Sequence, residues 1–338
     1  MSNVPAERNA DFAPRIITTD TFPDIEALKL RRGTGGRSSY NGLTVTVFGS
    51  TGFLARSLVN HLGRIGTLVV CPYRGDPFFA RNLKLAGDLG QIQFVPFNLR
   101  DTDTVHRALK YSNVVINLIG RDNPTSNFDF NDVHVEGARS IARIAKEAGV
   151  KRFIHVSSLN SSPNPERYWI KGGSNFLKSK YFGELAVREE FPEATIFRPA
   201  DIFGQDDNYL RYLCVFYRRS YRAFALTNGG YGITKTPVYV GDVAQGIVNS
   251  ITDEEAIGNT YDAVGPRRYE VRVLMEYLQN IIGKERFDGF KITNLRWSPV
   301  MRARITLTSY LGKIVLKNPR VSWEKMERVC IFFIYLFL

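Results

Sequence analysis

A glycine-rich segment, residues 45–55, has the residue types and spacing of a phosphate-binding turn. Gly49 and Gly52 have no side chain, so the backbone can turn tightly there and approach a pyrophosphate closely. The small Ala55 allows the following helix to pack close to the preceding strand, and the free N–H groups at the start of that helix attract anions. The residues expected to form this site are Gly49, Ser50, Thr51, Gly52, Phe53 and Leu54.

The end of the second expected strand bears on which dinucleotide would bind. In NAD-binding folds an acidic residue about 20 positions after the glycine turn bonds the adenosine ribose. No acid occurs in residues 70–74, but Arg74 could hold a 2′-phosphate through charge-assisted hydrogen bonds. This predicts NADPH as the cofactor; the alternative is that Arg74 is an ordinary solvent-exposed arginine.

Short β-branched runs alternate with longer runs of helical periodicity around this segment. Such alternation is typical of a parallel sheet covered by helices, and right-handed crossovers would wind it into a Rossmann-type doubly wound α/β fold. The expected strands are residues 43–48, 67–72, 92–97, 114–119 and 153–156.

Charge and length indicate how the 338 residues are organised. The net charge is +12, and the residues from Arg267 onward hold 14 basic and 6 acidic side chains, which points to an acidic, phosphate-rich or lipid partner for that part. A solvated basic face is the alternative. We expect an extended leader (1–42), a dinucleotide-binding domain (43–205), a smaller basic C-terminal lobe (206–328) and an apolar tail (329–338) that is too short to cross a bilayer.

Other classes of protein and of site are excluded by the composition. With 44% hydrophobic residues the chain is neither disordered nor collagen-like. Cys71, Cys214 and Cys330 are too far apart for a disulfide framework or a zinc site, which favours a reducing compartment. The first 26 residues resemble neither a secretory signal nor a basic presequence. No nucleic-acid motif is present, so no nucleic-acid partner is expected.

Several motifs together resemble the atypical short-chain dehydrogenase/reductases: the glycine turn, residues 117–120, Ser157 with Ser158, and residues 197–204. Longer segments, residues 36–39, 59–64, 87–91, 112–122, 127–130, 146–150 and 238–243, resemble the accessory subunit of mitochondrial respiratory complex I known as alpha subcomplex subunit 9. The resemblance implies a tightly held NADPH, a position on the matrix side of the inner mitochondrial membrane near the junction with the membrane arm, and other complex I subunits as partners. The further residues expected at the cofactor are Asn117, Ile119, Gly120, Ser157, Lys180 and Pro199.

Catalysis in this superfamily needs a tyrosine, with a lysine four residues later that lowers the pKa of its phenol. Lys180 is present, but position 176 holds a phenylalanine, which has no proton to give. Tyr168 and Tyr181 lie nearby with the wrong helical spacing. We therefore expect no catalytic residues; the alternative is a soluble NADP-dependent reductase or epimerase that uses a displaced tyrosine.

The basic C-terminal part contains one amphipathic stretch, from Trp297 to about Lys317, in which Arg302, Arg304 and Lys313 flank apolar residues. This pattern predicts a helix that contacts a partner subunit or anionic lipid headgroups, or one that packs against the core. The sequence alone does not separate these two alternatives.

Overall fold

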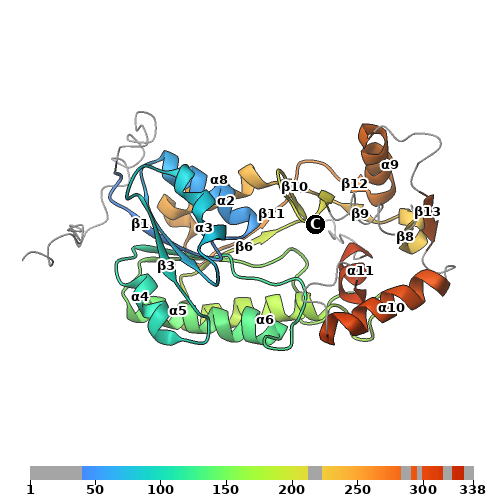
Figure 1. The fold of residues 1–338 in the computed structure, drawn as a ribbon, viewed down its shortest axis with the longest axis horizontal. Coiled ribbons are helices and arrows are strands. Elements are labelled where there is room, and N and C mark those ends of the chain that lie inside the picture. Colours follow the sequence, from blue (N-terminus) through green and yellow to red (C-terminus); the bar gives the residue numbers. More distant parts are fainter. Residues whose placement is uncertain (1–39, 212–222, 283–290, 295–298, 315–321, 331–338) are drawn as a thin grey trace, which may run out of the picture.

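The computed structural model describes residues 40–211, 223–282, 291–294, 299–314 and 322–330. These residues form a large parallel sheet with helices on both faces and, beside it, a smaller lobe (Figure 1). Nearly all of the predicted leader and apolar tail, as well as Cys214 and Lys317, lies outside the described residues.

Seven parallel strands form the central sheet, in the order β11-β6-β5-β4-β1-β2-β3. The crossovers run in opposite directions on the two sides of β1, which confirms the predicted doubly wound, Rossmann-type sheet. All five predicted strands are present, whereas β6 and β11 were not predicted. The strands are β1 (Thr44–Phe48), β2 (Leu68–Tyr73), β3 (Ile92–Pro96), β4 (Val114–Asn117), β5 (Arg152–Val156), β6 (Thr195–Pro199) and β11 (Thr260–Ala263).

Helices cover both faces of this sheet: α2 and α8 lie on one face, and α4, α5 and α6 on the other (Figure 1). Side chains alternate along β1, so Val45 and Val47 pack with the α2 and α8 layer while Phe48 packs with the α4 and α5 layer. The helices are α2 (Phe53–Arg64), α3 (Phe78–Arg81), α4 (Thr102–Leu109), α5 (Gly137–Glu147), α6 (Asn175–Glu190) and α8 (Val240–Thr252), with the short helices η1 (Asn82–Ala86), η2 (Asp132–Glu136, a π-helix) and η4 (Glu254–Ala256).

The smaller lobe has its own core of Leu226, Ile233, Val271, Met275 and Leu278. It is built from short strand pairs and helices: β7 (Ile202–Phe203) with β10 (Val238–Tyr239), β9 (Thr234–Lys235) with β12 (Tyr269–Glu270), β8 (Ala223–Leu226) with β13 (Lys291–Asn294), then η3 (Thr227–Gly230), α9 (Val271–Ile282), α10 (Pro299–Ile314) and α11 (Trp323–Cys330).

Residue 205 remains a predicted domain boundary, although two elements beyond it belong to the larger part. α8 packs against α2, and β11 pairs with β6 at the edge of the sheet. The predicted helix near Arg302 is present as α10, while the side chains of Arg304 and Lys313 lie outside the description. No helix in the described part of the chain combines the length and apolar character needed to span a bilayer.

Candidate functional site

The glycine turn lies where β1 passes into α2, and its conformation requires glycine. Gly49 has a φ of 81°, and a Cβ at this position would lie 3.0 Å from the backbone carbon of Leu118. The N–H of Gly52 donates to the carbonyl of Gly49 at 2.9 Å, which closes the turn. Gly52 is also the N-cap of α2, and no side chain of the described residues caps this helix end. The arrangement is that of an anion-binding helix N-terminus.

The other predicted residues of the turn have different surroundings. The Ser50 hydroxyl is buried and donates to the carbonyl of Pro72 at 2.8 Å, which fixes the turn to β2. Leu54 is buried in the core between the sheet and α2, and Thr51 is exposed. Phe53 lines the cavity described below.

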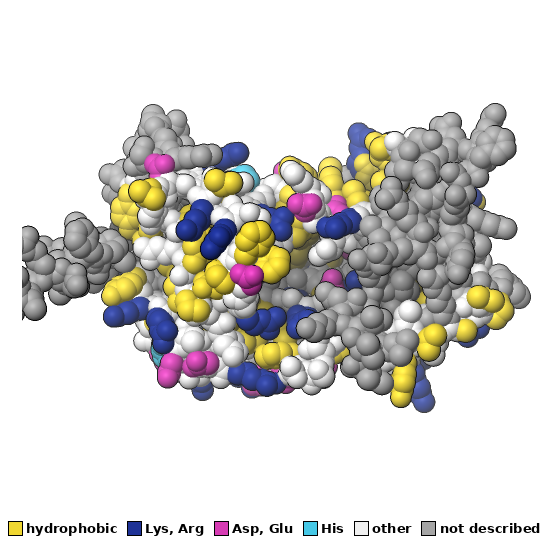
Figure 2. Space-filling view, viewed as in Figure 1, with side chains coloured by type: hydrophobic (Ala, Val, Ile, Leu, Met, Phe, Trp, Pro, Cys, Tyr) yellow, Lys and Arg dark blue, Asp and Glu magenta, His cyan; other side chains and the backbone are white. Residues whose placement is uncertain are grey.

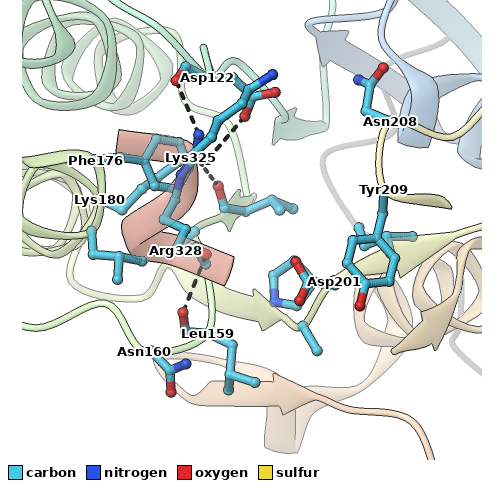
Figure 3. Close-up of a pocket in the computed structure, with 18 of the residues that line it drawn as sticks. Asp122, Leu159, Asn160, Phe176, Lys180, Asp201, Asn208, Tyr209, Lys325 and Arg328 are labelled. Carbon is cyan, nitrogen blue, oxygen red and sulfur yellow. Dashed lines mark hydrogen bonds and ion pairs between the residues drawn. The ribbon is translucent and has the colours of Figure 1, made fainter. Parts of the chain in front are cut away.

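A cavity of about 350 Å³ opens at the carboxyl ends of the parallel strands, where such folds bind their ligands (Figure 3). The smaller lobe supplies one wall, with Tyr209, Lys235, Lys325 and Arg328. The predicted residues that line the cavity are Phe53, Gly120, Ser157, Lys180 and Pro199; those that do not are Gly49, Ser50, Thr51, Gly52, Leu54, Arg74, Asn117 and Ile119.

Two polar residues at the strand ends have different surroundings. The Asn117 amide oxygen accepts from the Ile119 N–H at 3.0 Å, and its nitrogen lies 3.3 Å from Nδ1 of His155, so this side chain shapes the end of β4. The Ser157 hydroxyl is buried and has no hydrogen-bond partner within the described part of the chain. A buried polar atom of this kind at a cavity wall is available to a ligand.

Lys180 is buried beneath the cavity, and its ammonium donates to the carbonyl of Val156 at 3.1 Å. Burial lowers the pKa of Lys180 from 10.5 to about 8, with Glu184 and Asp122 partly opposing the shift. A Cβ on Gly120 would lie 3.2 Å from the Lys180 ammonium, so glycine leaves room for this side chain.

Stability above pH 8 offers a test of this burial. Between pH 8 and 10.5 only the unfolded state keeps the Lys180 proton, so stability rises with pH in this window. We expect wild type to gain up to about 3 kcal/mol relative to Lys180→Met, measured by urea unfolding. Lys178→Met, on the same helix, is the control. Parallel pH profiles for wild type and Lys180→Met would contradict the buried, shifted amine.

A buried histidine network lies beside Lys180. His134 Nε2 accepts from the Arg121 N–H at 3.1 Å, and its Nδ1 lies 2.8 Å from the Ser179 hydroxyl, which in turn donates to the Phe176 carbonyl. Burial, followed by the charge of Lys180, lowers the pKa of His134 to about 2 and that of His155 to about 3. Both imidazoles are therefore neutral at physiological pH.

Phe176 lies four residues before Lys180, at the position where the sequence predicts the tyrosine of the superfamily. It is buried, and its ring packs edge-on against Phe130 and His134 at centroid distances of 6.0 and 5.2 Å. The guanidinium of Arg328 covers the ring at 4.2 Å from the centroid. A ring packed in this way provides no proton to the cavity.

Tyr168 and Tyr181, the tyrosines next to the Lys180 region in sequence, do not line the cavity. Tyr181 packs on Phe182, and the backbone of Tyr168 is bonded to Glu327. Among the described residues, the tyrosine in the cavity wall is Tyr209, on the side opposite Phe176 (Figure 3). Burial raises the pKa of Tyr209 well above its usual value, and Asp201 and Asp207 add to the shift. That direction is the reverse of what an acid–base tyrosine needs.

Arg74 lies near two further arginines that the sequence analysis did not identify. Arg74 and Arg100 both lie over the Phe128 ring, at 5.8 and 4.4 Å from its centroid. Partial burial, together with the charge of Arg74, lowers the pKa of Arg121. A position near two mutually repelling guanidinium groups favours an anion. The adjacency of Arg121 to Gly120 was the available sequence signal.

Comparisons with known proteins agree with this geometry. Residues 45–263 match the model of the NAD dependent epimerase/dehydratase family. The fold is similar to that of UDP-glucuronic acid 4-epimerase from Bacillus cereus, solved with UDP-glucuronic acid and NAD, with a TM-score of 0.61 at 16% identity over 85% of this chain and 99% of that one.

The relatives with higher sequence identity are named as subunits of NADH-ubiquinone oxidoreductase, not as epimerases. NADH dehydrogenase (ubiquinone) 1 alpha subcomplex subunit 9, mitochondrial, from Mus musculus is 44% identical over 88% of this chain and 74% of its own length. The NADH-ubiquinone oxidoreductase 40 kDa subunit, mitochondrial, from Neurospora crassa is 40% identical over 81% and 72%. This chain therefore belongs to the NAD dependent epimerase/dehydratase family and, within it, to the family of the alpha subcomplex subunit 9 of respiratory complex I.

Proposed function

We propose that this protein is a non-catalytic, NADPH-binding accessory subunit of mitochondrial NADH:ubiquinone oxidoreductase. It would support the assembly and stability of the matrix arm, near its junction with the membrane arm, on the matrix side of the inner membrane. The observation that carries the proposal is the pairing of a glycine turn suited to a dinucleotide with a buried Phe176 where a proton donor would be needed. The names of the relatives support the location and the partners.

Three features of the chain's own residues support a nicotinamide dinucleotide. Gly49 permits the turn that brings backbone N–H groups to a pyrophosphate. The Ser157 hydroxyl, which has no hydrogen-bond partner among the described residues, and the buried Lys180 ammonium line the cavity at the strand ends, where the nicotinamide half would bind. When bound, the cofactor would be a hydride carrier. The chain's residues would hold it without a neighbouring side chain that donates a proton to a substrate.

The choice of NADPH over NADH depends on Arg74, which lies close enough to Arg121 for its charge to lower the pKa of Arg121. We expect Arg74→Ala to weaken NADPH binding by about tenfold or more while changing NADH binding less than twofold, because only NADPH carries the 2′-phosphate. Isothermal titration with both dinucleotides measures this, with Arg143→Ala on α5 as a control. An equal loss for both cofactors, or an unchanged preference, would remove Arg74 from the phosphate site.

The competing function is a soluble NADP-dependent reductase or epimerase with a displaced tyrosine. Tyr209 is the candidate that the cavity offers, but the direction of its pKa shift disfavours proton transfer at neutral pH. Native isolation separates the two functions: co-migration with the respiratory complex, retained nucleotide and no turnover support the accessory subunit. A free protein that turns over NADPH with a small carbonyl or sugar-nucleotide substrate would establish the competitor.

Exposed apolar and basic side chains provide surfaces for partner subunits. On α10, Val300, Leu307 and Tyr310 are exposed together with Arg302, a combination that also suits anionic lipid headgroups. On α3, Phe78 and Phe79 are exposed next to Arg81. Figure 2 shows hydrophobic and basic side chains next to one another on the face in view. Patches of this composition mark interaction sites.

A further inference from the structure

Helix α11 forms part of the cavity wall next to α6, and it carries an unusual buried acid. Figure 3 shows Lys325 and Arg328 of this helix beside Phe176 and Lys180 of α6, with Asn208 and Tyr209 on the opposite side. The Glu327 side chain is 0% exposed. A carboxylate leaves water only at a large cost unless hydrogen bonds replace its hydration.

The hydrogen bonds of Glu327 come from three consecutive backbone N–H groups. Its carboxylate accepts from Tyr168 at 2.6 Å, from Trp169 at 2.7 Å and from Ile170 at 3.1 Å. Successive N–H groups that converge on one point form an anion-binding concavity. The loop 168–170 is therefore a carboxylate-binding site, and Glu327 occupies it.

A second acid of the same helix binds the start of α6. Glu324 accepts from the Phe176 N–H at 3.0 Å and from the Ser174 hydroxyl. Ser174 is itself the N-cap of α6, so Glu324 adds a negative charge at the positive end of this helix. α6 carries both Phe176 and Lys180, so α11 is bonded directly to the helix that forms the cavity floor.

The remaining contacts of α11 close the wall of the cavity. The Arg328 guanidinium covers Phe176 and bonds both the carboxylate and the carbonyl of Asp122, at 3.2 and 3.1 Å. Lys235, buried and 3.3 Å from Asp201, donates to the Arg328 carbonyl at 2.8 Å. α11 is thus held by charged contacts at residues on both sides of the cavity.

We propose that α11 is an intramolecular cover of the cleft. Its two acids bind, in cis, a carboxylate-binding site formed beside the cavity by the N–H groups of 168–170 and the start of α6. This docking holds Lys325 and Arg328 in the cavity wall, where they take up space that a second substrate would need. The docked α11 also slows the exit of a nucleotide from the cavity. This second effect rests on the nucleotide binding proposed above. Undocking of α11 then becomes the step that exchanges nucleotide.

The test is Glu327→Gln in the full chain, because the amide places an N–H₂ group against N–H donors with little change of volume. Hydrogen exchange of the amides of residues 168–170 reports docking directly. We expect it to rise by about tenfold or more in this variant. Glu276→Gln, an exposed acid of α9, is the matched control and should leave the exchange rate unchanged. Equal exchange in wild type and Glu327→Gln would overturn the docking.

Nucleotide release is the second measurement. NADPH dissociation, followed by fluorescence during a chase with unlabelled NADP⁺, should be at least about tenfold faster in Glu327→Gln than in wild type or Glu276→Gln. Arg328→Gln, which keeps both carboxylate contacts, should show an intermediate rate and remains informative if Glu327→Gln fails to fold. An unchanged release rate in both variants overturns the closure. Failure of wild type to bind NADPH would instead contradict the proposed function, while the exchange result would still decide the docking.

Discussion

The free energy of unfolding is expected to fall steeply as the pH drops below 6.5, because His134 and His155 are buried in their neutral forms. Burial and neighbouring cations lower the pKa of His134 to about 2 and that of His155 to about 3. Below pH 6.5 both histidines bind a proton in the unfolded state but stay neutral in the folded state. The free energy of unfolding therefore decreases as the pH falls toward 3. Each proton contributes about 1.4 kcal/mol per pH unit, which amounts to roughly 5 kcal/mol between pH 6.5 and 4.5.

Such a loss is comparable to the whole stability of a typical domain, so acid should unfold the protein near this range. Urea unfolding at several pH values measures the slope. The double variant His134→Gln, His155→Asn retains an acceptor oxygen at each site, cannot titrate, and should lose most of the slope. His106→Gln, which replaces a half-exposed histidine, is the control and should leave it unchanged. The same steep slope in the double variant would show that these imidazoles are not the acid-sensitive groups.

The second large effect is expected from Gly183→Ala in α6. A Cβ at Gly183 would lie 2.2 Å from the carbonyl oxygen of His134, and a backbone atom in a packed helix cannot rotate away. α6 must then move away from η2 and α5, which opens the packing around the histidine network. We expect a loss of about 3 kcal/mol or more in the free energy of unfolding, measured by denaturant titration.

Gly246→Ala in α8 is the matched control for this substitution. Its Cβ would lie 3.7 Å from a carbon of the Phe197 ring, which is an ordinary contact. Both glycines lie inside helices, where alanine is intrinsically more favourable by about 1 kcal/mol. Gly246→Ala should therefore be neutral or stabilising. If the two variants proved equally stable, the close approach of α6 to η2 would not be a feature of the molecule in solution.

The sequence predicted the parts of the fold whose signals are local. The glycine turn and the five strands are each encoded within a few neighbouring residues, and all are present. β11 was missed because it is an edge strand with a largely exposed, polar pattern, TYDA, that lacks the apolar alternation of a strand. β6 was noted as part of a family motif, but its run is short and ends in a proline.

The site was harder to predict because its second wall comes from distant parts of the chain. Lys180 could be identified from its spacing to position 176, and Gly120 and Ser157 from their places at strand ends. Glu327 looks like an ordinary charge on a surface helix, and only the fold places three backbone N–H groups around it. The burial of His134 could not be predicted either, because nothing in the sequence distinguishes a buried histidine in a helix from an exposed one.

The separation between Glu327 and its donors also affects how the protein is made. The bonds join residues 157 to 159 positions apart, so a nascent chain exposes the loop 168–170 long before its partner has been synthesised. Most of the sheet can form from crossovers between strands that are close in sequence. The cavity wall can be completed only after α11 has been synthesised. A chain truncated before Glu327 would therefore leave the ribosome with the loop 168–170 lacking its carboxylate partner.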